Sequence, residues 1–211
     1  MRGRRYFLAA AICVVLGLAA NRPTADTGAT DPGAFVSDLS AAAVESLTER
    51  GLSQPERADR FRALLTAHFD LPGIGKFVLG RYWRSAAEAE RQEFLTLFED
   101  FIVRTYIERF STYSGEAYRV QTVRDDEDGY ATVRGEIVRP NADNLRVDWR
   151  MRWDGAEFKI IDMVVEGVSM ALTQRDDFAA VIQKGGGRVA ALNDVLRQRA
   201  AAPVQNQSAA Q

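Results

Sequence analysis

The chain has 211 residues, with 27 lysines and arginines against 29 aspartates and glutamates and a formal net charge of −2. Because basic and acidic residues are intermixed and no base-stacking motif accompanies them, the composition argues against nucleic-acid binding. The single cysteine, Cys13, lies in an apolar N-terminal run, and there is one histidine, which nearly excludes a zinc site or a thiol nucleophile. A hydrophobic content of 46% supports one domain with a sizeable core.

The N-terminus has the pattern of an export signal. Three arginines precede an apolar run over residues 6–20 that is too short to span a bilayer comfortably. We predict a signal peptide that is cleaved after Ala19 or nearby, and the pair Arg4-Arg5 leaves an ordinary Sec signal and a twin-arginine signal both open. The predicted organisation is a signal peptide over 1–20, a flexible spacer over 21–33, one domain over 34–201 and a disordered tail over 202–211.

Helical periodicity dominates the first half of the domain. Apolar residues recur at 3.6-residue spacing, and prolines, glycines and a capping-box pattern, Ser85 with Glu88, indicate where helices begin and end. The longest helix has a wide apolar stripe from Phe94 to Phe110, which needs a broad apolar surface to pack against. The predicted helices cover residues 34–47, 55–69, 74–79, 85–110, 174–184 and 188–201.

Period-two alternation follows the long helix. Leu145, Val147, Trp149, Met151 and Trp153 alternate with charged residues, which indicates a half-buried strand. Turn residues separate this strand from its neighbours, so we predict an antiparallel meander over about 118–124, 130–139, 145–153 and 158–166, with 168–172 as an extension. The expected fold is α+β, with the N-terminal helices and the long helix on one face of a sheet of about four strands, and with C-terminal helices, on an NTF2-like or cystatin-like plan.

Catalytic patterns are weak. His68 lies on an apolar helix face, where a core or pocket-edge imidazole is the simpler interpretation, and Ser169 and Thr173 have no evident base. Residues 125–129 lack the ligand spacing of a calcium loop and predict a hairpin turn, and residues 73–76 lack the spacing of a phosphate-binding loop. A second hypothesis is a small enzyme that uses Asp148 or Asp162 as a base in an apolar cavity.

The chain strongly resembles the MlaC-type family, also called toluene-tolerance auxiliary proteins of an ABC transporter. The matching segments occur in the family's order from about Arg60 to Leu196. They are residues 77–84, 93–94, 97–101, 104–106, 113–116, 147–150, 159–162, 165–169 and 172–175.

This resemblance implies a soluble periplasmic carrier without enzymatic activity. Its cargo would be phospholipid, held in an internal apolar pocket between helices and a curved sheet, with no other cofactor. As a monomer it would exchange lipid between an outer-membrane lipoprotein/porin complex and an inner-membrane ABC transporter with an MCE-domain protein, maintaining outer-membrane lipid asymmetry. A hopanoid-related carrier and an interaction module that carries no lipid remain alternatives.

The resemblance also implies a set of lipid-lining residues, taken from the family segments and the inferred inner faces. Arg81, Arg84, Arg104 and Arg175 present charge either at the pocket mouth or to a partner, or serve as helix ends and structural ion pairs. The implied lining is Phe77, Phe94, Leu97, Phe98, Phe101, Tyr106, Trp149, Met151, Val165 and Val168.

Overall fold

The computed structural model describes residues 31–111, 113, 115–140 and 142–201. The predicted signal peptide, the predicted tail and nearly all of the predicted spacer lie outside the described residues. The described elements are α2 (Pro32–Leu47), α3 (Gln54–His68), α4 (Leu71–Leu79), α5 (Tyr82–Ser85), α6 (Glu88–Ser111), β1 (Ala117–Asp125), β2 (Tyr130–Val138), β3 (Leu145–Trp153), β4 (Phe158–Val165), β5 (Val168–Ser169), α7 (Met170–Lys184) and α8 (Val189–Ala201).

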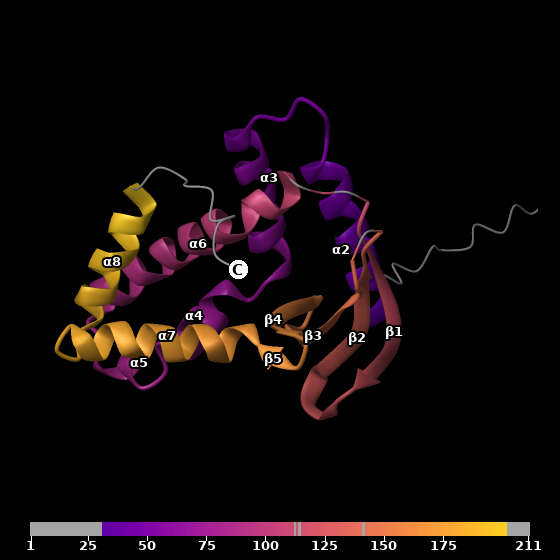
Figure 1. Ribbon diagram of the computed structural model, residues 1–211. Helices are drawn as coiled ribbons and strands as arrows, with labels where there is room; N and C mark the ends of the chain where they lie inside the picture. The colour runs from indigo at the N-terminus through magenta and orange to yellow at the C-terminus, as the bar shows by residue number, and fades with distance from the viewer. Residues whose placement is uncertain (1–30, 112, 114, 141, 202–211) are drawn as a thin grey trace, which may run out of the picture.

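The sheet and most of the helices occupy opposite ends of the molecule (Figure 1). The five strands form one antiparallel sheet in the order β1-β2-β3-β4-β5, so neighbours along the chain are also neighbours in the sheet. α2 packs on β1 and β2, α4 to α8 gather at the other end, and α3 bridges the two groups. The predicted α+β class and the antiparallel meander are confirmed. Among the described residues, no helix combines the length and apolar character needed to cross a membrane.

Local capping explains where the first helices begin. α2 starts at Pro32, two residues before the expected position, because the Asp31 carboxylate accepts hydrogen bonds from the backbone N–H groups of Gly33 and Ala34. α4 begins at Leu71, three residues before the predicted start, because Pro72 fits the first turn of a helix, where its missing N–H costs nothing. Asp70 caps this helix by accepting from the Gly73 N–H at 3.0 Å.

The predicted capping box at the start of the longest helix is wrong. Ser85 is the last residue of the short helix α5, and its hydroxyl donates to the Tyr82 carbonyl at 3.1 Å. α6 begins at Glu88, and the Glu90 carboxylate accepts from the backbone N–H of Ala87 at 2.9 Å. The sequence therefore contained a capping carboxylate, but it sits two residues later than predicted.

The sheet register places the apolar residues of the strands on one face. Val133 of β2 lies opposite Trp149 of β3, and Ala131 lies opposite Met151. A bulge between Arg150 and Met151 adds a residue to β4, which changes the face that its side chains occupy beyond that point. The predicted turn at residues 125–129 is confirmed as the β1–β2 connection, a short 3-10 turn over residues 127–129.

The core consists of two main clusters, one at each end. The sheet core joins α2 to the inner face of the sheet. The helix core joins α4, α6, α7 and α8, and the apolar stripe of α6 from Phe94 to Phe101 belongs to it. We expected this stripe to pack on the sheet, but α6 packs chiefly against α8, α3 and α4. A third cluster of Leu65, Leu71 and Val103 lies between α3, α4 and α6.

The start of α7 is tied to the sheet by one carboxylate. Asp162 of β4 accepts hydrogen bonds from the Ser169 hydroxyl at 2.7 Å and from the Ala171 N–H at 3.0 Å. Ser169 caps α7 by accepting from the Leu172 N–H at 3.0 Å. α7 consequently begins at Met170, four residues before the predicted start and inside the segment that was expected to extend the last strand.

Candidate functional site

The inner face of the sheet carries the apolar cluster that we take as the candidate site. Val133, Met151 and Ile160 are completely buried there, and α2 packs against them. Apolar side chains line this wall because the strands alternate between two faces and α2 covers only one of them. The buried members of the sheet core are Phe35, Val36, Leu39, Ala131, Val133, Met151, Phe158 and Ile160.

Trp149 is the centre of an aromatic group on this wall. Its ring meets Phe69 edge to face at 6.3 Å between centroids, and Tyr118 at 6.0 Å. The Tyr118 hydroxyl donates to the Val147 carbonyl at 2.9 Å. Burial, and secondarily the charge of Asp148, raise the pKa of Tyr118 well above its ordinary value, so this hydroxyl remains a neutral donor. The Trp149 indole N–H is buried and makes no hydrogen bond of regular geometry with the described residues, but it lies near enough to the Tyr118 hydroxyl to oppose the rise of that pKa slightly.

The predicted lining residues of α6 lie in the helix core. Phe94 is completely buried, stacks on Phe98 at 5.6 Å and meets Phe178 of α7 edge to face at 5.9 Å. Leu97 is buried in the same cluster, and Phe101 packs against Phe178 at 5.7 Å. The structure therefore separates these four predicted residues from Trp149 and Met151, which face the sheet core.

The remaining predicted lining residues are not gathered with either group. Phe77 of α4 is 44% exposed and Val168 of β5 is 52% exposed. Val165 lies opposite Val147 and is half-buried at the β4 end of the sheet, and Tyr106 is half-buried on α6. Their role as lipid lining stays a prediction.

The four singled-out arginines are spread over the helices. Arg81 donates to the Tyr82 hydroxyl at 2.8 Å, and Arg175 lies over the Phe77 ring at 5.3 Å. Arg84 and Arg104 are exposed on α5 and α6. None of the four lines either cavity described below.

The two carboxylates of the enzyme hypothesis lie on the outer face of the sheet. The Asp162 carboxylate accepts hydrogen bonds from the start of α7 and forms an ion pair with the Arg150 guanidinium at 3.3 Å. The Asp148 carboxylate forms an ion pair with the Arg134 guanidinium at 3.7 Å. Both alternate with Trp149 and its neighbours, so they point away from the sheet core. Within the described residues, no group of three or more histidine, cysteine, aspartate or glutamate side chains is placed to hold a metal ion.

His68 borders the sheet core. Its ring meets Phe35 edge to face at 5.6 Å. Burial lowers the pKa of this imidazole, with a smaller opposing effect from Glu157 and a reinforcing one from Lys159. The sequence-based interpretation of a core or pocket-edge histidine agrees with this position.

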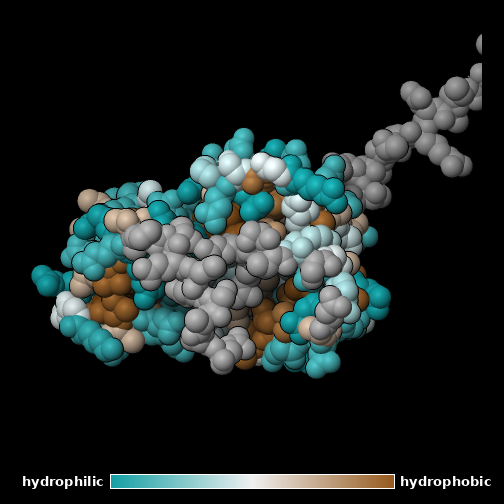
Figure 2. Space-filling view, turned by 45° about the horizontal axis from the view of Figure 1, so that its top comes forward, coloured by the Kyte–Doolittle hydropathy of each residue, from teal (hydrophilic) through white to brown (hydrophobic). Residues whose placement is uncertain are grey.

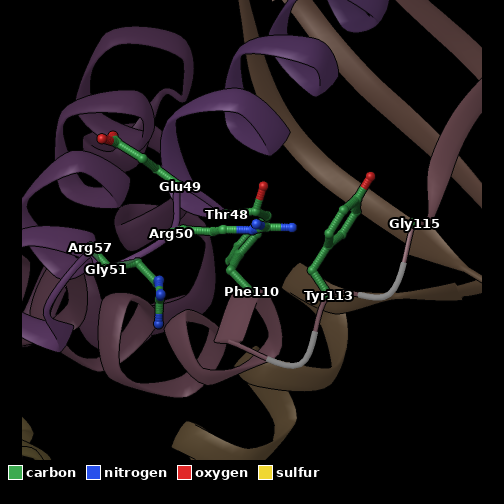
Figure 3. A pocket seen from close by; sticks show the side chains of 8 residues that line it. All are labelled: Thr48, Glu49, Arg50, Gly51, Arg57, Phe110, Tyr113 and Gly115. Atoms are coloured by element: carbon green, nitrogen blue, oxygen red, sulfur yellow. The ribbon is translucent and has the colours of Figure 1, made fainter.

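Two open cavities accompany these clusters. The first, about 500 Å³, lies where the ends of α2 and α6 meet the start of α3 and the segment before β1, and charged residues contribute to its wall (Figure 3). The second, about 340 Å³, is more apolar and lies between α3, α4 and α6, with Phe69, Leu71 and Leu95 in its wall. The first is lined by Thr48, Glu49, Arg50, Gly51, Arg57, Phe110, Tyr113 and Gly115. Arg50 was not predicted from the sequence, because an arginine after a helix end belongs to no distinctive pattern.

Comparison with known proteins identifies the family. The family model described as MlaC protein matches residues 37–198. The chain belongs to the MlaC family. The resemblance found in the sequence is thus confirmed.

Two relatives of this MlaC family member have descriptive names. The intermembrane phospholipid transport system binding protein MlaC of Haemophilus influenzae is 25% identical over 144 residues, which are 66% of this chain and 66% of the relative. The toluene tolerance protein ttg2D of Pseudomonas putida is 24% identical over 129 residues, which are 61% of this chain and 60% of that protein. The match therefore spans about two thirds of the relatives' length or slightly less.

A solved structure supports the fold of this MlaC family member. It is a phospholipid-binding protein from Ralstonia solanacearum in complex with a phospholipid, and it superposes with a TM-score of 0.74. The superposition covers 81% of this chain and 97% of that chain at 22% sequence identity. At this identity the likeness establishes the shared fold.

Proposed function

We propose that this protein is a periplasmic phospholipid carrier. It takes up one lipid at a time as a monomer and exchanges it between an outer-membrane lipoprotein/porin complex and an inner-membrane ABC transporter with an MCE-domain protein, which maintains outer-membrane lipid asymmetry. The observation that carries this proposal is the family match over residues 37–198, together with relatives named for phospholipid transport and phospholipid binding.

We place the acyl chains beside the inner face of the sheet. Trp149 and Met151, predicted from the sequence, lie on this face, and Phe69 connects it to the third cluster and to the second cavity. Burial of an acyl chain gains about 0.8 kcal/mol per CH₂ and requires only an apolar wall that adapts.

The helix core is a less suitable place for acyl chains. Its aromatic rings pack against one another, since the Phe178 ring lies 5.7 to 6.0 Å, between centroids, from the rings of Phe94, Phe98 and Phe101. A chain entering there would have to separate packed rings. The second cavity borders both clusters, through Leu95 on the helix core and Phe69 on the sheet core, and the ring packing is therefore what argues against the helix core. We therefore assign the residues of the α6 stripe a structural role.

Carrier function requires no catalytic group. Transfer of a lipid breaks no covalent bond, so the only requirements are a dry wall, a route in and out, and a surface that docks at the membrane complexes. The two carboxylates of the enzyme hypothesis serve structural ion pairs on the opposite face. We propose no cofactor other than the cargo lipid.

Native mass spectrometry of the protein purified from its own periplasm tests the proposal. We expect an added mass that matches one phospholipid, identified by extraction and fragmentation. A hopanoid in place of phospholipid would change the cargo class. Protein that stays free of lipid, and that takes none up from phosphatidylglycerol or phosphatidylethanolamine vesicles, would refute the carrier function and leave an interaction module.

A pair of variants tests the position of the acyl chains. Phe69→Ala removes a ring shared by the sheet core and the third cluster, so we expect weaker uptake of fluorescent phospholipid from vesicles. Tyr130→Ala is the matched control, because this ring is 43% exposed at the start of β2. Equal uptake by both variants, with both folded, would place the acyl chains elsewhere.

A further inference from the structure

The larger cavity has a composition that differs from the apolar walls around the sheet. Arginine, threonine and tyrosine side chains surround an aromatic floor formed by Phe110 (Figure 3). Its volume of about 500 Å³ lies in the range of small-molecule sites. In Figure 3, Arg50 extends toward Tyr113, while the Glu49 side chain points away from both.

Most of the charges at this cavity already have partners. Glu49 pairs with Arg60 at 2.5 Å. Arg57 donates from Nε to the Leu47 carbonyl at 2.9 Å and from Nη2 to the Leu52 carbonyl at 3.5 Å, so it neutralises the carbonyl end of α2.

Of the described residues that line this cavity, Arg50 is the cation without a partner. It forms no hydrogen bond or ion pair with the residues that the structure describes, and the Tyr113 hydroxyl is likewise unpartnered within that part of the chain. The carboxylate that lines the same cavity, Glu49, is held by Arg60 and points elsewhere. The described part of the cavity therefore offers an uncommitted guanidinium and a hydroxyl donor, a combination that suits an oxyanion with several acceptor atoms.

We propose that this cavity binds a phosphate group through Arg50, with the Tyr113 hydroxyl as a second donor, and that the phosphate is that of the cargo lipid's headgroup. The inference rests on the proposed carrier function. A planar guanidinium matches two oxygens of a phosphate at once, which fixes the headgroup while the glycerol and acyl chains continue inward.

Aromatic contacts connect the cavity to the sheet. Phe110 on its floor contacts Phe61 of α3 at 5.5 Å between ring centroids, and Phe61 packs on the third cluster. Phe69 packs on the same cluster and meets Trp149 at 6.3 Å. A row of packed aromatic side chains thus joins the cavity to the wall where we place the acyl chains, and a bound chain would displace some of these rings.

The test measures the phosphate and the acyl chains separately. Isothermal titration compares dioctanoyl phosphatidylglycerol with dioctanoylglycerol, which has the same chains and no phosphate, on the full protein and on Arg50→Gln. We expect the substitution to weaken binding of the phosphatidylglycerol about three- to tenfold, since an exposed charge-assisted contact is lost, and to leave dioctanoylglycerol unchanged. The matched control is Arg188→Gln at the opposite end, where the guanidinium makes one 3.4 Å contact with the Gly185 carbonyl.

Each contrary outcome has its own meaning. Arg50→Gln that binds phosphatidylglycerol as tightly as the unmodified protein would overturn the headgroup site and leave the carrier function intact. An unmodified protein that binds neither lipid would overturn both. Inorganic phosphate, followed by its ³¹P resonance, separates the two sources: phosphate binding lost in Arg50→Gln with unchanged lipid affinity would assign the cavity to free phosphate and refute the headgroup proposal.

Discussion

A substitution of Phe94 tests whether the helix core is separate from the sheet face where we propose that the acyl chains bind. The Phe94 side chain is completely buried, stacks on Phe98 at 5.6 Å and meets Phe178 edge to face at 5.9 Å. Phe94→Leu keeps most of the apolar volume but loses both ring pairs. Because each aromatic pair contributes about 0.5–1.5 kcal/mol beyond area burial, we expect the free energy of unfolding to fall by about 1–3 kcal/mol.

Urea unfolding followed by tryptophan fluorescence measures this loss. With a slope of about 2 kcal/mol per M, a loss of about 2 kcal/mol lowers the midpoint by about 1 M. Tyr130→Leu is the control, since its ring is 43% exposed, and we expect a change within about 0.5 kcal/mol. An unchanged urea midpoint for Phe94→Leu together with a selective loss of phospholipid affinity would show that Phe94 contacts the acyl chains. That result would refute the structural role that we assign to the α6 stripe.

Three further predictions concern two buried positions, Gly135 and Asn193, and the half-buried His68. Gly135→Ala places a Cβ against the Tyr118 ring and the neighbouring backbone of β1, so we expect a loss of about 1–3 kcal/mol in urea unfolding, and an unchanged midpoint would contradict the close approach. Asn193→Ala removes the completely buried amide that donates to the Glu90 carbonyl at 3.1 Å, and we expect the free energy of unfolding to fall by about 1–3 kcal/mol. Because the folded pKa of His68 lies below its ordinary value of 6.5, the unfolded chain takes up the proton first, so stability is full above pH 6.5 and falls as the pH drops below it. His68→Gln should flatten this decline between pH 7 and 5.5, and an identical slope in both proteins would rule out His68 as its source.

Surface character alone locates neither site. Figure 2 shows patches of hydrophobic residues among a mainly hydrophilic surface on the face that it presents. Exposed apolar side chains such as Phe77, Val168 and Leu172 occur away from both cavities. Exposed apolar residues are normal on globular proteins, so the exposure of these side chains does not by itself indicate a binding site.

Regular local patterns were read correctly from the sequence. The alternation over residues 145–153 predicted both ends of β3 correctly, because apolar and polar residues alternate along a strand that has one buried face. Predictions failed where several residues compete for one local role. Ser85 and Glu90 both offer a capping group near the start of α6, and only the folded chain shows which backbone N–H is left to be satisfied.

The sequence by itself determined most of the elements, the fold class and the family of this protein, because periodicity, turn residues and ordered motifs are properties of neighbouring positions. The tertiary structure decided which surfaces meet. An apolar stripe such as that of α6 predicts that this helix face is buried, but it does not predict which element covers it. In the structure, other helices cover it instead of the sheet. It also decided that Arg50 has no partner among the residues that the structure describes, because the pairing of Glu49 with Arg60 and of Arg57 with the end of α2 depends on how two helices pack. Burial and charge pairing depend on residues that are distant in the chain, so only the folded chain reveals them.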